Sequence, residues 1–279
     1  MMENWKVAKN CKSLTTEDGI ELTYCEFGEE NEEVVISFAF YHHTWLPVEE
    51  MLGKKYHVYG VVQRFGDGEG TVFEEDGTIN WSKQWGDDLY KFAKALGIES
   101  FHYIGKCHGS TPGWYMMKYH PEMLKSFCSF YLAPHTTEKN GNEWDTNDPT
   151  IIAKAMRKLQ TGMEKKKAEL ASLSQGPAEY GKTPPAFDYI LGHGLWESKE
   201  ECKAFLENNS KPVCYMFGTD DLLFRDWKDS NMAAVFGTKR ARTIFLQGER
   251  HLMELDCPQR IAREAEFFFE DSKNNDYFD

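Results

Sequence analysis

Short apolar runs with the pattern of β-strands alternate along this chain with longer amphipathic runs, and this alternation limits the fold more than any other feature. The strand-like runs are residues 33–40, 56–62, 101–104, 126–132, 212–217 and 242–246, with a half-exposed edge strand expected at 20–25. Apolar residues three to four apart predict helices at 81–96, ended by Gly97, and at about 258–269. Strands that alternate with helices form a mostly parallel central sheet flanked by helices. The sequence therefore predicts an α/β fold.

The alternation is interrupted between two of these strands. The sequence predicts a long charged helical segment at 149–174, then the breakers Gly176-Pro177 and Pro184-Pro185, and a short helix at about 199–207. An insertion of this size predicts a helical cap at 135–211, with the core formed by 1–134 and 212–279. The alternative is an ordinary crossover connection between the two strands, with additions to its helix.

Composition excludes some classes of partner. The 279 residues are 41% hydrophobic and 14% aromatic, enough for a packed core, and the net charge of −13 argues against binding to nucleic acid or to an anionic membrane. Seven widely spaced cysteines without a C-x-x-C pair are typical of reduced thiols in a cytosol. With no signal-peptide pattern and no apolar stretch of membrane-spanning length, we expect a cytoplasmic protein. The sequence leaves a homodimer open.

One five-residue motif predicts a sharp turn with a reactive side chain at its apex. Gly105-Lys106-Cys107-His108-Gly109 follows the strand at 101–104 and precedes a helical run that includes Trp114. Strand, G-x-nucleophile-x-G and helix form a nucleophile elbow, whose tight turn leaves room only for glycines beside the nucleophile. The motif alone is weak, because many cysteines are simply buried.

Acidic and basic partners for Cys107 follow the next strands in the expected order. Asp220 and Asp221 come directly after the strand at 212–217, and His251 follows the strand at 242–246. Ligands of α/β sheets gather at the carboxyl ends of the strands, so we expect these side chains to lie together. The order nucleophile, acid, histidine is that of an α/β-hydrolase.

From about residue 20 to residue 269 the chain resembles the cap-bearing α/β-hydrolases. The similar segments are Gly218-x-x-Asp221, Gly248-x-x-His251 with Pro258 beyond it, Tyr119-His120-Pro121-Glu122, and the loop at 63–68. The resemblance implies that Cys107 is the nucleophile and His251 the base, and it favours Asp221 over Asp220 as the acid. A cysteine nucleophile resembles the dienelactone hydrolases, although Ser110 replaces a glycine of their motif.

The resemblance also implies two backbone donors for an oxyanion. Aligned strand ends make Phe40 the first donor, with Tyr41 as the neighbouring candidate, and the N–H of His108 the second. This chain departs from the family here, because Phe38-Ala39 stands where the family usually has His-Gly.

Substrate contacts are expected next to these groups. The candidates are Tyr41, His42, Trp45, Trp114 and Tyr131, although most buried aromatic residues belong to a core. His42 with His43 and a carboxylate also suggests a metal, but no other spacing supports one, so neither a metal nor a cofactor is expected.

The expected function is hydrolysis of a carboxylic ester, lactone or thioester through a Cys–His–Asp triad and a thioester intermediate. An acyltransferase or cyclase that diverts the same thioester is the alternative among enzymes. A ligand-binding relative without turnover is the alternative from another class. The expected partner is a small acyl substrate.

Overall fold

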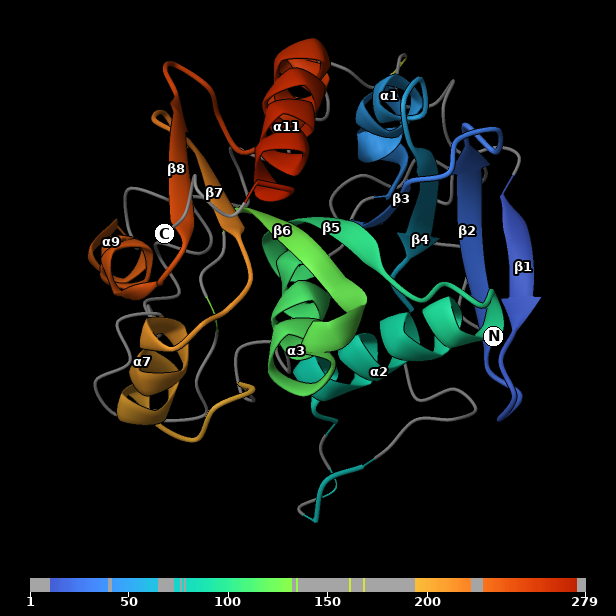
Figure 1. Cartoon of the computed structure of the whole chain (residues 1–279), viewed down its shortest axis with the longest axis horizontal. Helices are drawn as coiled ribbons and strands as arrows, with labels where there is room; N and C mark the ends of the chain where they lie inside the picture. Colours follow the sequence, from blue (N-terminus) through green and yellow to red (C-terminus); the bar gives the residue numbers. More distant parts are fainter. Residues whose placement is uncertain are drawn as a thin grey trace.

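The central element of the structure is an eight-stranded sheet with the order β1-β2-β4-β3-β5-β6-β7-β8 (Figure 1). The computed structural model describes residues 11–39, 42–64, 73–75, 77, 79–131, 134, 161, 168, 194–221 and 228–274. The strands are β1 (Lys12–Thr15), β2 (Glu21–Phe27), β3 (Val34–Ala39), β4 (His57–Val62), β5 (Phe101–Lys106), β6 (Leu124–Phe130), β7 (Val213–Gly218) and β8 (Ala241–Leu246). β1 pairs with β2 and β2 with β4 antiparallel, and every other pairing is parallel. The predicted mostly parallel sheet is confirmed.

Helices cover both faces of this sheet. They are α1 (His42–Leu52), α2 (Trp81–Ala95), α3 (Thr111–Tyr119), α7 (Lys199–Glu207), α9 (Lys228–Gly237), α10 (Met253–Asp256) and α11 (Pro258–Ser272), with short 3-10 turns at Cys107–Ser110 and Pro121–Met123. In Figure 1, α1 and α11 lie on one side of the sheet and α2 and α3 on the other. Each face therefore has its own apolar layer.

The apolar residues of successive strand positions divide between these two layers. Toward α2 and α3 the core contains Tyr103 and Phe127, while Ile104 and Cys128, one position on, belong to the layer under α1 and α11. Parallel strands covered on both faces are expected to be apolar throughout, as the continuous runs in the sequence indicated.

The predicted helix α2 is confirmed with its caps. Asn80 accepts a hydrogen bond from the Lys83 N–H at its start, and Gly97 adopts the left-handed conformation at its end, with φ of 68°.

One expectation about the N-terminal half is wrong. The run at 20–25 is not an edge strand, because β1 pairs with the outer side of β2 and takes the edge position. The helices α1 and α9 were not predicted. Pro47 lies inside α1, a position that the sequence alone disfavours, and burial of Trp45, Val48 and Leu52 against the sheet stabilises the helix.

Most of the predicted cap at 135–211 lies outside the described residues and stays a prediction. Within that range α7 is described, and its Cys202 and Leu206 pack into the core layer of α2 and α3. Among the helices that the structure describes, none is long and apolar enough to cross a membrane.

Candidate active site

Cys107 stands at the apex of a sharp turn between β5 and α3. It has a φ of 52°, in the left-handed region that a residue with a side chain rarely adopts. Backbone strain of this kind costs about 1–3 kcal/mol and persists where the surrounding structure imposes it, most often at functional sites. Cys107 as a whole is half-buried. The strand, turn and helix predicted around G-x-C-x-G are present.

The turn is held by close packing and two hydrogen bonds. A Cβ on Gly105 would lie 2.2 Å from the carbonyl oxygen of Gly109, so residue 105 has no room for a side chain. The Ser110 hydroxyl donates to the Gly105 carbonyl at 2.7 Å, and the Tyr103 hydroxyl donates to the Gly109 carbonyl at 2.5 Å. Ser110, a departure from the motif of the dienelactone hydrolases, thus closes the elbow itself.

Asp221 and His251 meet beyond the ends of β7 and β8. The His251 Nδ1 lies 2.9 Å from the Asp221 Oδ2, and the Asp221 carboxyl is 2% exposed. Asp220, the other candidate acid, is exposed to solvent. Cys107 and His251 are close enough for each to shift the pKa of the other. The structure thus pairs the expected acid with the expected base, and the triad with Cys107 stays a prediction.

The loops that carry Asp221 and His251 are joined to each other. The Asp220 N–H donates to the Glu249 carbonyl at 2.9 Å, and the Gly248 N–H donates to the Thr219 hydroxyl at 2.8 Å. A Cβ on Gly218 would lie 2.5 Å from the Glu249 carbonyl oxygen, so this glycine permits the approach. Backbone contacts therefore fix the distance between the acid and the imidazole.

Tyr131, directly after β6, contacts the loop that carries His251. Its hydroxyl donates to the Arg250 carbonyl at 2.5 Å, and its ring centre lies 4.8 Å from that of His251. The residue has a φ of 67° and is 2% exposed. The sequence proposed it as a substrate contact, which stays a prediction, whereas its position beside His251 was not anticipated.

The protonation of Cys107 and His251 is linked. Burial alone would raise the pKa of the Cys107 thiol, but the charge of His108 and hydrogen bonds with His108 and His251 hold this pKa well below its usual value. Burial alone would lower the pKa of His251, but the charge and hydrogen bond of Asp221, together with Cys107, raise it to about 9. Both shifts favour a thiolate beside an imidazolium at neutral pH.

Alkylation of Cys107 by iodoacetamide is therefore expected to stay fast at mildly acidic pH. In His251→Asn the thiolate loses its partner, its pKa rises, and the rate at low pH falls about tenfold for each unit of that rise. Peptide mapping after timed alkylation measures the rate at Cys107 in the wild type and in His251→Asn. Cys257 is an internal control, because burial and the nearby Glu249 raise its pKa to about 12. A wild-type Cys107 that reacts only as pH approaches about 8.5 contradicts the ion pair.

A buried ion pair that the sequence did not predict lies next to Cys107. The Lys106 Nζ is 2.5 Å from the Glu254 Oε1, and the two side chains are 5% and 0% exposed. The same carboxylate oxygen accepts from the Thr44 hydroxyl at 2.8 Å. Thr44 is in α1, Lys106 precedes Cys107, and Glu254 is three residues after His251, so one carboxylate joins three segments of the candidate site. The sequence does contain one sign of this pair: Lys106 ends an apolar strand, and a buried lysine almost always has a charged partner.

The other predicted site residues are placed as follows. Trp45 and Trp114 are each 1% exposed and lie in the core layers on opposite faces of the sheet, so a substrate contact for either stays a prediction. His42 is buried beside Glu49, with 3.2 Å between Nε2 and Oε2. His108 is 6% exposed, directly after the nucleophile. Phe40 and Tyr41 lie outside the described residues.

Comparisons with known proteins identify the fold. No protein-family model and no curated protein sequence matches the chain. An enol-lactonase from Burkholderia xenovorans superposes with a TM-score of 0.67 at 16% identity, over 93% of this chain and 100% of that one. A hydrolase from Pseudomonas aeruginosa superposes with a TM-score of 0.66 at 15% identity, over 94% of this chain and 99% of that one. An esterase from Thermogutta terrifontis superposes with a TM-score of 0.65 at 13% identity, also over 94% of this chain and 99% of that one. The chain has the α/β-hydrolase fold.

Proposed function

We propose that the protein hydrolyses a carboxylic ester, lactone or thioester, with Cys107 as nucleophile, His251 as general base and acid, and Asp221 as the group that orients His251. The observation that carries the proposal is the pairing of the His251 Nδ1 with the Asp221 Oδ2 at 2.9 Å, beside a Cys107 in a strained left-handed conformation whose pKa His251 helps to lower. Nucleophilic catalysis needs this arrangement of nucleophile, base and orienting group.

In the proposed reaction, the Cys107 thiolate attacks the acyl carbon and forms a tetrahedral oxyanion. The N–H of His108 is one donor to this oxygen, and the N–H of Phe40 is the second. The bond to the leaving group then breaks, and His251 gives its proton to the departing oxygen or sulfur. His251 next takes a proton from water, and the hydroxide attacks the thioester and releases the acid and the thiolate. Each oxyanion donor contributes about 2.7–4 kcal/mol to transition-state stabilisation.

The choice of substrate class follows from the nucleophile. Thiolate is a better leaving group than an amine, so the tetrahedral adduct of an unactivated amide returns to substrate. Esters, lactones and thioesters have leaving groups that compete with the thiolate. The enol-lactonase and the esterase with the same fold are consistent with this class.

The insertion at 135–211 is part of the proposal as a helical cap over this site. Its supporting feature is its place in the chain, after β6 and before β7, whose carboxyl ends carry Tyr131 and Asp221. Residues of the cap would then determine which acyl group enters.

The proposal predicts a covalent intermediate on one cysteine. With an activated aryl ester, we expect a burst of the aryl alcohol, and mass spectrometry of the quenched protein should find the acyl group only on the peptide that contains Cys107. An adduct that is stable in water but is released by an added alcohol or amine would instead indicate the acyltransferase. If neither wild type nor Cys107→Ala turns over the ester and neither is acylated, the protein is a ligand-binding relative.

A further inference from the structure

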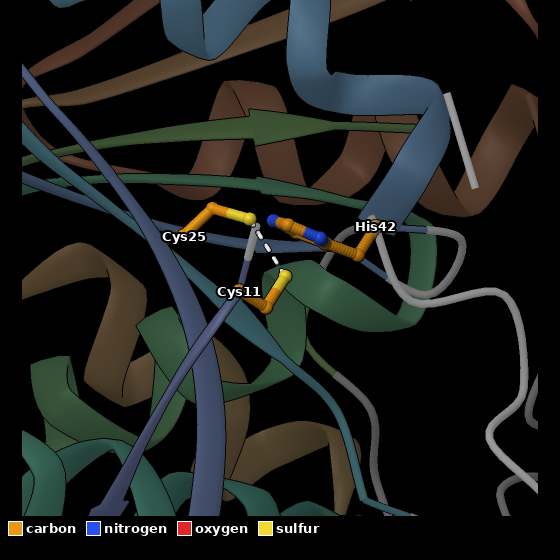
Figure 2. Close-up of side chains that lie close together, drawn as sticks. All are labelled: Cys11, Cys25 and His42. Atoms are coloured by element: carbon orange, nitrogen blue, oxygen red, sulfur yellow. Dashed lines mark hydrogen bonds between the residues drawn. The ribbon is translucent and has the colours of Figure 1, made fainter. Parts of the chain in front are cut away.

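A second group of reactive side chains lies on the α1 side of the sheet, and the proposed reaction does not use it. It consists of Cys11 just before β1, Cys25 in β2 and His42 at the start of α1 (Figure 2). One donor atom from each of these residues lies within 4.8 Å of the other two. Figure 2 shows the two sulfurs side by side and the His42 ring directed toward them. Within the described ranges, this is the one trio of cysteine, histidine or acidic residues that meets this distance criterion.

The sheet brings the two cysteines together. β1 and β2 are antiparallel with Lys12 opposite Tyr24, so one further step along the ladder places Cys11 opposite Cys25. Cys25 and His42 are buried and Cys11 is half-buried. The Cys11 and Cys25 sulfurs are 2.6 Å apart, and Cys11 lies directly before β1, the edge strand of the sheet.

A buried carboxylate stands beside the third member of the trio. The Glu49 Oε2 lies 3.2 Å from the His42 Nε2, and the two side chains are 0% and 1% exposed. Gly60, opposite Cys25 in β4, provides the space, because a Cβ there would lie 2.5 Å from both Glu49 carboxylate oxygens. Buried charges are paired or coordinate metals, and a carboxylate commonly orients a metal-binding histidine.

We propose that Cys11, Cys25 and His42 bind one Zn²⁺ ion, with Glu49 as the acid that orients the imidazole. Two thiolates and an imidazole match the preference of Zn²⁺ for sulfur and nitrogen, and a fourth position is left for water. Binding releases the two thiol protons. With Zn–S bonds of about 2.3 Å in a tetrahedral site, the two sulfurs stand about 3.8 Å apart, which rotation of the Cys11 side chain provides.

The ion has a structural role in this proposal. It joins the β1–β2 hairpin at the sheet edge to the first turn of α1, which begins directly after the segment of the expected oxyanion donor Phe40. An ion that binds the folded state and not the unfolded one raises the melting temperature, so zinc is expected to protect this region against unfolding.

Zinc content and cobalt substitution test the site in the full-length protein. After purification with a reductant, the wild type should contain one Zn²⁺ per chain by elemental analysis. Replacement by Co²⁺ should give the thiolate-to-cobalt charge-transfer band and the visible bands of a tetrahedral site. Removal of zinc by a chelator should lower Tm, and addition of Zn²⁺ alone should restore it.

Three variants and a matched control assign the ligands. Cys25→Ser and His42→Gln should lose the ion and the cobalt bands, and Glu49→Gln should weaken zinc binding by about 10–100-fold. Cys257→Ser removes a partly exposed cysteine outside the trio and should leave both unchanged. The proposal is overturned if reduced wild type binds no Zn²⁺, or if the cobalt bands persist in Cys25→Ser. A purified protein that is lighter by two hydrogens and still binds no metal after reduction assigns the pair to a disulfide instead.

Discussion

Replacement of Cys107 by alanine is expected to lower kcat for an activated aryl ester by about 10⁴- to 10⁶-fold, with little change in KM. The nucleophile contributes only once the acyl carbon is attacked, so its loss removes stabilisation of the transition state and not of the bound substrate. The residual rate then comes from the oxyanion donors and from binding of the ester.

Cys107→Ser separates the chemistry of the nucleophile from the shape of the elbow. A serine fits the same turn, but its hydroxyl does not form an anion at neutral pH, so the resting ion pair with His251 is lost. We expect a kcat between those of wild type and Cys107→Ala, together with a lower pKa of His251. Cys257→Ala, at the residue between α10 and α11, is the matched control and should retain full activity. Equal kcat values for wild type and Cys107→Ala, measured on protein with an unchanged circular dichroism spectrum, contradict the proposed nucleophile.

Local patterns were sufficient to predict the parallel part of the fold and the positions of the three candidate side chains. Buried parallel strands are apolar throughout, and the polar residues that follow β5, β7 and β8 stand out against them. Because the carboxyl ends of parallel strands meet at one edge, Cys107, Asp221 and His251 were expected together before any distance was known. The pairing of His251 with Asp221 at 2.9 Å agrees with that expectation.

Features that depend on contacts between distant segments were not predictable in this way. α1 contains Pro47, which disfavours a helix locally, and only burial against the sheet stabilises it. β1 is short and mostly exposed, and it is a strand only because it pairs with the outer edge of β2. The buried Lys106 was visible in the sequence, but its partner Glu254 is 148 residues away and carries no local signal.

Among the ion-paired lysines that the structure describes, Lys106 is the most buried, and its loss is expected to cost the most stability. Removal of one member of a buried pair leaves the other charged and unpaired, at a cost of about 3–5 kcal/mol. Lys106→Met should therefore lower the free energy of unfolding, measured with urea, by about that amount. It should also lower kcat, because Lys106 adjoins Cys107 and Glu254 lies in α10, which follows His251.

Two further variants decide whether the unpaired charge is the cause. Lys106→Met with Glu254→Leu removes both charges, so the double variant should recover much of the stability that Lys106→Met loses. Lys55 and Glu266 form an ion pair at 2.6 Å, but the lysine is 62% exposed, so Lys55→Met should cost only about 0–1 kcal/mol. A loss in Lys106→Met no greater than that in Lys55→Met would show that the buried pair does not hold the three segments together. Recovery of stability without recovery of kcat in the double variant would separate its role in folding from its role in positioning Cys107 and His251.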